Sequence, residues 1–167
     1  MDESSVHAAI DAIAAAGIEA VAVCLLHSYA NPAHERRIGE LLAKRLPGLF
    51  VSLSVDVLPE IREYERTSTT VINSFVGPPV KTYLDSLRDR LKAAGLPPQF
   101  FMMHSAGGII DSRTVTARPA QIVECGPAAG VIGARAAMLQ AGFRDAIAFD
   151  MGGTTVSYTH LTLPTSA

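Results

Sequence analysis

The chain has 167 residues, of which 49% are hydrophobic and 18% charged, and its formal net charge is −2 at pH 7. This amount of apolar material can form a core, which argues against a disordered chain. A length of 167 residues fits about one domain or parts of two. The near-neutral balance argues against nucleic-acid partners and anionic membrane surfaces, because both require a clustered basic face.

The two cysteines, Cys24 and Cys125, are too few and too far apart for a disulfide framework. We therefore expect reduced thiols in a cytoplasmic protein. No segment is expected to reach the ~18 apolar residues of a membrane span, so no membrane partner is expected. The N-terminus is acidic and does not resemble a signal peptide.

The N-terminal third of the chain alternates helical and extended patterns. Helical spacing predicts helices over residues 6–16 and 31–46. Short apolar runs predict strands over residues 20–26 and 49–54, the first buried on both faces as in a parallel sheet. The order helix–strand–helix–strand is typical of an α/β sheet with crossover helices.

The middle of the chain predicts two helices, over residues 60–75 and 80–94, with a boundary between sub-lobes somewhere in residues 56–98. Four successive β-hydroxyl residues at 67–70 are poor helix formers. Gly-Pro-Pro at 77–79 is expected to break or kink the pattern, since proline lacks a backbone N–H.

The third part restarts the α/β rhythm. Residues 100–103 and 146–150 predict strands, residues 111–117 a short helix and residues 127–141 an Ala-rich helix. The sequence His-Ser-Ala-Gly-Gly at 104–108 predicts a Gly-rich loop, which is either a ligand loop or a β-turn.

The strongest chemical signal follows the last predicted strand. Asp150 ends that strand, and Gly152, Gly153, Thr154 and Thr155 follow. Two glycines let backbone N–H groups approach phosphate oxygens, threonine hydroxyls add donors, and an aspartate can hold Mg²⁺. The alternative is an ordinary hairpin with glycine at positive φ.

Two further motifs carry weaker chemical signals. Residues 125–133 place Gly126 and Gly130 at the start of a helix, where they allow either an anion at the helix N-terminus or tight helix packing. Residues 60–70 concentrate charged and hydroxyl groups, which is typical of a solvated helix with ion pairs.

Residues 156–165 depart from the pattern of the rest. They match the translated end of a transposon adaptor used to prepare sequencing libraries, so we predict that residues 156–167 are a library scar. The alternative is a genuine hairpin strand, because Val, Tyr and Thr favour strands.

Four stretches together resemble the hydantoinase A/5-oxoprolinase family, which includes related subunits of acetone-type carboxylases: residues 25–35, 59–73, 126–134 and 150–154. The resemblance implies an actin-like, sugar-kinase-like (RNase-H-like) ATPase fold, truncated at both ends. Residues 1–75 would then end the N-terminal domain, and residues 76–155 would begin the hydantoinase A domain.

The resemblance also implies a function and a site. The family uses ATP and Mg²⁺ to phosphorylate the oxygen of a cyclic amide before water opens the ring, and a hydantoinase B-type partner subunit is expected. By this match Asp150 to Thr155 form the phosphate loop with Asp150 as metal ligand, while Gly126 and Gly130 lie against the cofactor. No catalytic residue is assigned.

Two departures from the family pattern bear on activity. The loop in the family continues through Thr or Ser to an aspartate that is missing here, and Ala106 stands where many relatives have asparagine. We therefore expect this polypeptide to be inactive and its parent to be an enzyme. Alternatives are an acetone-type carboxylase subunit and a non-catalytic actin-like module.

Overall fold

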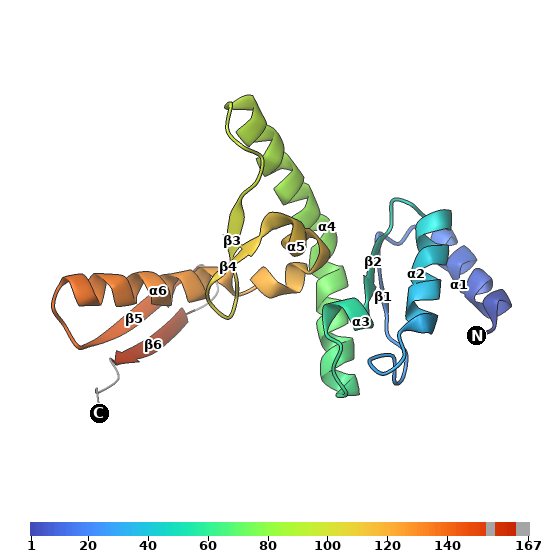
Figure 1. The fold of residues 1–167 in the computed structure, drawn as a ribbon, viewed down its shortest axis with the longest axis horizontal. Coiled ribbons are helices and arrows are strands. Elements are labelled where there is room, and N and C mark those ends of the chain that lie inside the picture. The colour runs from blue at the N-terminus through green and yellow to red at the C-terminus, as the bar shows by residue number, and fades with distance from the viewer. Residues whose placement is uncertain (153–155, 163–167) are drawn as a thin grey trace. The chain divides into compact units, whose positions relative to one another are not determined.

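The computed structural model describes residues 1–152 and 156–162 and has mixed α/β architecture (Figure 1). It divides into two compact units. The first contains Met1–Pro98 with Thr116–Ala120, and the second contains Gln99–Val115 with Gln121–Ala167. Each unit has its own sheet elements.

The first unit is built on a parallel strand pair. Strands β1 (Ala20–Val23) and β2 (Phe50–Leu53) pair in parallel, and α2 (Ala33–Arg45) connects them. Helix α1 (Glu3–Ala15) packs on α2, and the short α3 (Ser54–Val57) follows β2. This arrangement confirms the expected α/β rhythm, although β1 ends three residues earlier than predicted.

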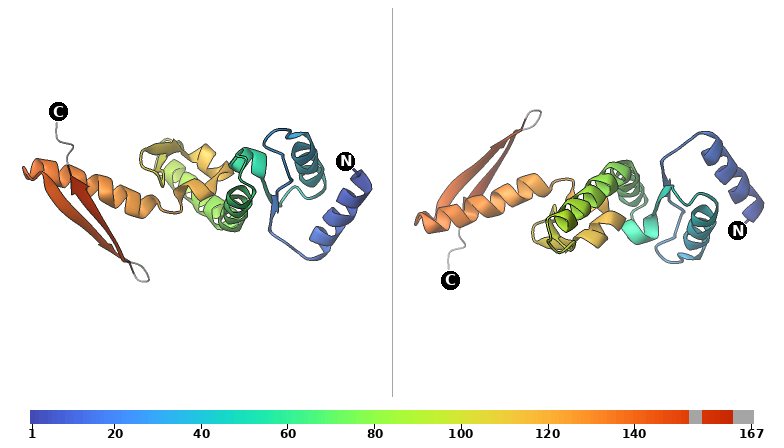
Figure 2. Two further views of the ribbon diagram at one scale, coloured as in Figure 1. Left: turned by 90° about the horizontal axis from the view of Figure 1, so that it is seen from below. Right: turned by 90° about the horizontal axis from the view of Figure 1, so that it is seen from above.

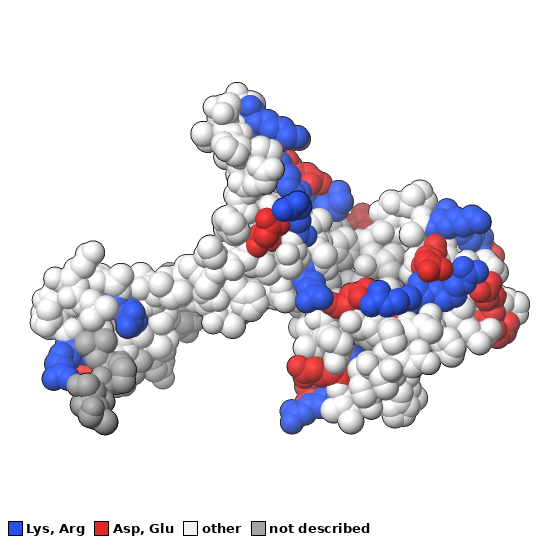
Figure 3. Space-filling model, in the orientation of Figure 1, with Lys and Arg blue, Asp and Glu red and all other residues white. Residues whose placement is uncertain are grey.

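The core of the first unit gathers on these elements. Its most buried apolar side chains come from α1, β1 and α2: Ile10, Val23, Leu41 and Leu42. The surface of this unit carries interspersed basic and acidic side chains (Figure 3). One ion pair, from Arg37 Nε to Glu3 Oε1 at 2.7 Å, joins α2 to α1.

The prediction of two helices in the middle of the chain is wrong. Residues Glu63–Ala93 form one helix, α4, of 31 residues, with Pro78 and Pro79 inside it. The two prolines remove two backbone donors but the helix continues, because α4 packs along both β1 and β2. Within the β-hydroxyl run, Thr70 donates its hydroxyl to the Arg66 carbonyl at 2.6 Å, so this buried polar group is satisfied inside the helix.

Two residues of α4 fix its contact with β2. Gly77 lies so close to Phe50 that an added Cβ would be 2.2 Å from the ring. Buried Asn73 donates to the Ser52 hydroxyl at 3.0 Å and to the Ala117 carbonyl at 3.3 Å. It also accepts from the Ala120 N–H at 3.1 Å, which ties the returning segment to the first unit.

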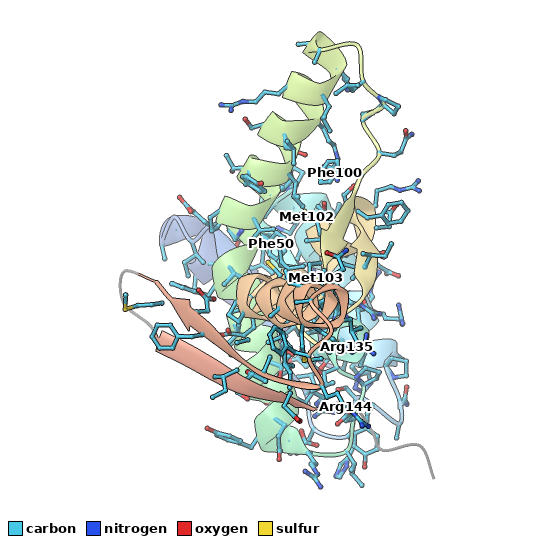
Figure 4. The ribbon with its side chains drawn as sticks, turned by 90° about the vertical axis from the view of Figure 1, so that its left-hand side faces the viewer. Phe50, Phe100, Met102, Met103, Arg135 and Arg144 are labelled. Carbon is cyan, nitrogen blue, oxygen red and sulfur yellow. The ribbon has the colours of Figure 1, made fainter. Side chains whose placement is uncertain are left out.

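The second unit contains two antiparallel hairpins and a helix (Figure 2). Strands β3 (Phe101–Met103) and β4 (Ile109–Asp111) form the first hairpin, and α5 (Ser112–Ala117) follows it. A 3₁₀ turn, η1 (Pro119–Ile122), leads into α6 (Cys125–Gln140). Met102 and Met103 are half-buried on β3, which packs on α6 (Figure 4).

The second hairpin joins β5 (Asp145–Met151) to β6 (Val156–Thr162), with Asp150 opposite Ser157. Residues 156–162 of the stretch interpreted as a library scar therefore adopt the conformation of the alternative, a hairpin strand. Conformation does not reveal the origin of a sequence, so the scar stays a prediction.

One stretch differs from the expectation about membrane spans. Residues Pro119–Gln140 form a helical stretch of 22 residues with mean hydropathy 1.3, long and apolar enough to cross a membrane by length and composition. The prediction that no segment reaches this length and hydropathy is therefore wrong for this stretch, in which Glu124 and Arg135 interrupt the apolar residues without lowering the mean hydropathy below that of a span. A single such helix is weak evidence for a span, because core helices of soluble proteins share this composition.

Candidate nucleotide site

The predicted acid lies near the end of β5. Asp150 is the last residue but one of this strand and is exposed, and Gly152, which is also exposed, follows the strand directly. Gly153, Thr154 and Thr155 lie outside the described residues. The structure therefore describes only residues 150–152 of the predicted loop, and the phosphate-binding role of all its residues stays a prediction.

The chain reverses between α6 and β5, and this reversal sets the polarity of the site. The strand runs back along the helix, so the end of β5 that carries Asp150 lies beside the N-terminal half of α6 (Figures 1 and 2). The first turn of a helix has N–H groups without intrahelical partners and carries the positive end of the helix dipole. A carboxylate and a source of anion-binding donors thus occur at the same end of this unit.

A cleft of ≈350 Å³ separates the helix from the hairpin. On the α6 side it is lined at one-turn spacing by Pro127, Gly130, Val131 and Ala134. On the strand side it is lined by residues 147–150 of β5 and by Thr159 of β6. Gly130 and Asp150, which were predicted separately from the sequence, line the same cleft, whereas Gly126 lies one turn before it.

The glycines of α6 do not serve close packing within the described residues. A Cβ added at Gly126, Gly130 or Gly133 would meet no atom within 4 Å. Tight packing through small residues was the alternative interpretation of this motif, and no described partner for such packing exists. The open space at Gly126 and Gly130 leaves room for another group to approach the helix backbone.

The polar run at residues 60–70 forms the start of α4 and is only partly solvated. Arg62 lies 3.6 Å from Glu65 in an exposed ion pair, as expected for a charged helix. Arg66 is instead fully buried, pairs with Glu63, and donates to the Leu25 carbonyl at 2.8 Å. Its Nε and Nη1 atoms have no described hydrogen-bond partner, and its guanidinium lies 5.5 Å from the Tyr29 ring centroid.

A buried carboxylate near Arg66 escaped the sequence analysis. Glu35 is 0% exposed and accepts from the Leu25 N–H at 2.7 Å, the Ser54 hydroxyl at 2.7 Å and the Val55 N–H at 3.1 Å. These bonds tie together the segments that follow β1 and β2. The sequence showed Glu35 only as an acid in a first helical turn, and that pattern does not distinguish a surface acid from a buried one.

Cys24 lies in the same region, directly after β1, and is a free, partly buried thiol. Burial raises the pKa of the Cys24 thiol, and hydrogen bonds with the Thr70 and Thr67 hydroxyls oppose this effect. The raised pKa keeps Cys24 protonated at neutral pH, and a protonated thiol is a poor nucleophile and metal ligand. Among residues 1–152 and the described part of the hairpin, no three His, Cys, Asp or Glu side chains converge on a metal site.

Comparison with known families identifies the chain. The hydantoinase/oxoprolinase family model matches residues 66–162, more than half of the sequence, and the model of the N-terminal region of the same family matches residues 1–46. The chain belongs to the hydantoinase/oxoprolinase family. The resemblance seen in the four sequence stretches is thereby confirmed.

Curated relatives of this hydantoinase/oxoprolinase chain are much longer proteins. An uncharacterized protein of Methanocaldococcus jannaschii is 43% identical over 82% of this chain and 20% of its own length. The caprolactamase subunit alpha of Pseudomonas jessenii is 32% identical over 95% of this chain and 23% of its own length. The chain therefore spans about a fifth of the curated relatives it matches.

Solved structures of the family have the same fold over this region. The nucleotide-free structure of acetone carboxylase, an enzyme of ATP-dependent acetone carboxylation, matches 96% of this chain and 23% of its own chain with 30% identity and a TM-score of 0.82. The crystal structure of ATP-dependent caprolactamase from Pseudomonas jessenii matches with a TM-score of 0.74 and 31% identity over 95% of this chain and 23% of its own. The α/β architecture is thus shared with an ATP-dependent carboxylase and with an ATP-dependent caprolactamase.

Proposed function

We propose that this chain carries a terminal-phosphate site of an ATP-dependent enzyme that activates a cyclic amide by phosphorylating its oxygen before ring opening. The observation that carries the proposal is the cleft in which Gly130 of α6 and Asp150 of β5 lie together. The actin-like ATPase fold and a partner subunit of hydantoinase B type belong to the same proposal. The names of the caprolactamase and its alpha subunit support both amide chemistry and a partner.

The residues around the cleft suit a nucleotide phosphate. Helix α6 offers first-turn N–H groups, and the bare backbone at Gly126 and Gly130 allows phosphate oxygens to approach. Apolar side chains of Val131 and Ile147 line the rest of the cleft. Backbone dipoles that are already oriented toward an anion stabilise it without having to reorganise.

Asp150 fits a Mg²⁺ ion that accompanies the phosphates. Magnesium in phosphoryl-transfer sites is held by one or two carboxylates, by substrate phosphate oxygens and by water. A single exposed carboxylate at the edge of the cleft meets this requirement without a cluster of protein ligands. Asp150 is therefore proposed as the metal ligand.

The chemistry explains why ATP is needed. An amide oxygen is a poor leaving group, whereas a phosphate bonded to that oxygen leaves readily once water has added to the carbon. ATP supplies the phosphoryl group for this activation. The residues of this chain hold the phosphates and offset the charge that develops on them, which is the main contribution of a protein to phosphoryl transfer.

The proposal predicts that Asp150→Asn weakens binding of Mg-ATP about tenfold to a hundredfold, because the substitution removes a charged ligand. Isothermal titration of the chain with Mg-ATP measures the change. Asp145→Asn is the matched control, since Asp145 is an exposed aspartate at the opposite end of β5. Equal affinity of the Asp150→Asn variant and the parent chain, or no affinity in either, would refute the proposal.

Acetone-type carboxylation is the second candidate, favoured by the TM-score of 0.82 with acetone carboxylase. Both reactions use ATP as the phosphoryl donor, and they differ in the molecule that accepts the phosphoryl group. Phosphate release by the full-length protein decides between them. Stimulation by cyclic amides supports the first function, and stimulation that requires a ketone together with bicarbonate supports the second. Nucleotide binding without turnover under either condition would favour a non-catalytic actin-like module.

A further inference from the structure

The Gly-rich loop between β3 and β4 is closed by its own hydrogen bonds. The His104 N–H donates to the Gly108 carbonyl at 3.1 Å, and the Gly107 N–H donates to the His104 carbonyl at 2.9 Å. The Ala106 N–H donates to Nδ1 of the His104 ring at 2.9 Å. Gly107 and Gly108 have φ values of +88° and +77°, which other residues rarely adopt. The loop therefore has one defined shape.

Ser105 connects this loop to the start of α6 through both of its polar groups. Its hydroxyl accepts from the Glu124 N–H at 3.0 Å, and its own N–H donates to the Gln121 carbonyl at 2.8 Å. Glu124 is the N-cap residue of α6 and has no capping side-chain bond of its own. The hydroxyl of Ser105 thus satisfies an N–H at the helix start that the helix itself leaves without a partner.

The loop also passes near Ile132, two turns further along α6. A Cβ at Gly107 would lie 3.8 Å from Cδ1 of Ile132. Ile132 is about 200° around the helix from Gly130, because each residue advances the helix by about 100°. The loop thus lies near the side of α6 opposite to the side that lines the cleft, and the two hydrogen bonds of Ser105 hold the start of the helix in place.

We propose that Ser105 is a positioning residue of the nucleotide site: by holding the N-terminus of α6 it aims the Gly130 face and the first-turn N–H groups at the cleft beside Asp150. This inference rests on the proposed function and deepens it. It also gives the loop at residues 104–108 a role that the sequence left open between a ligand loop and a simple turn. Ser105 acts through α6 and does not touch the nucleotide.

The test compares three serine variants of the chain. Ser105→Ala removes the acceptor for the Glu124 N–H and is expected to raise the Kd for Mg-ATP about fivefold to tenfold, the effect of one hydrogen bond. Ser105→Thr keeps a hydroxyl at the same position and is expected to restore the affinity. Ser86→Ala, at an exposed position of α4 in the other unit, is the control for the chemical change.

Two readouts separate positioning from general destabilisation. Isothermal titration gives the Kd for Mg-ATP, and amide hydrogen exchange reports the protection of the Glu124 N–H and of the amides of β5. The expected result for Ser105→Ala is faster exchange at Glu124, unchanged exchange in β5 and weaker binding. Unchanged Kd in Ser105→Ala, or a Kd that Ser105→Thr does not restore, would overturn the inference while leaving the proposed function intact. A parent chain without affinity for Mg-ATP would overturn both.

Discussion

At the scale of single residues, buried polar side chains organise the first unit more than its charged surface does. Glu35 is the best example, because three donors converge on one carboxylate, one from the segment after β1 and two from the start of α3. Oε1 accepts hydrogen bonds from the Leu25 N–H and the Ser54 hydroxyl, and Oε2 accepts one from the Val55 N–H. A buried carboxylate satisfied in this way holds the ends of β1 and β2 in register.

Substitution of Glu35 by glutamine is expected to destabilise the chain by about 2 kcal/mol. The amide keeps the shape of the side chain, but its NH₂ group must face a donor whichever way it is turned. Urea unfolding followed by circular dichroism measures the change in the free energy of unfolding.

Glu40→Gln provides the matched control for this substitution. Glu40 lies on the same helix, its side chain is 67% exposed, and its pair with Arg37 is a surface ion pair of the kind that contributes little to stability. Equal effects of the Glu35 and Glu40 substitutions would contradict the role assigned to Glu35.

The sequence nominated candidate site residues, whose roles stay predictions, but it could not show which of them lie together. Asp150 followed from a strand that ends in an acid, and Gly130 followed from glycines at a helix start. Their presence in one cleft depends on the chain reversal after α6, a tertiary feature that no local pattern contains. Glu35 and Arg66 were missed as buried groups for the same reason, because burial of a charged side chain is decided by distant partners.

At the scale of elements, α4 shows how packing overrides local preference. Gly-Pro-Pro predicts an interruption, yet the helix passes through it while packed on both strands. Gly77 makes this contact possible, since only a residue without a side chain fits against the Phe50 ring. The glycine therefore serves packing here and not helix termination.

Gly77→Ala is expected to lower the stability by about 1–3 kcal/mol, as overpacking of a core does. Alanine normally stabilises a helix by about 1 kcal/mol relative to glycine, so the clash must outweigh this gain. Gly133→Ala in α6, where an added Cβ meets open space, is expected to raise stability instead. Thermal unfolding followed by circular dichroism gives the sign of both changes.

A double variant tests whether the Phe50 ring is the cause. In a chain that already carries Phe50→Ala, the Gly77→Ala substitution is expected to be neutral or stabilising, because the ring that the methyl group would strike is gone. A loss of the same size in both backgrounds would show that the strain arises elsewhere in α4.

Most elements followed from local patterns, but the short α3, the 3₁₀ turn η1, strand β4 and the unbroken α4 did not. The apolar runs and helical spacing located α1, α2, α6, β1, β2 and β5, because hydrophobic periodicity is a local property. Strand β4 was missed, since three residues after two glycines carry no periodic signal and become a strand only by pairing with β3. The unbroken α4 was missed because its stability comes from the strands beneath it.

At the scale of the whole molecule, the chain exposes an unusual amount of apolar surface among its described residues. Four large apolar side chains lie exposed in the N-terminal half of α4: Tyr64, Val71, Ile72 and Phe75. Three more are exposed at alternate positions of β5: Ile147, Phe149 and Met151. Contiguous apolar patches of this kind drive association in water.

The chain is therefore expected to self-associate at micromolar concentration, and sedimentation velocity measures this. Phe75→Lys is expected to shift the population toward monomer, because Phe75, at 82%, is the most exposed of the four α4 side chains. Phe143→Lys is the control, since Phe143 is 66% exposed but stands in the turn before β5. If the parent chain sediments as a monomer and unfolds in one sharp cooperative transition, the exposed side chains are not an association surface. If both lysine variants dissociate the chain equally, the added charge and not the α4 patch controls association.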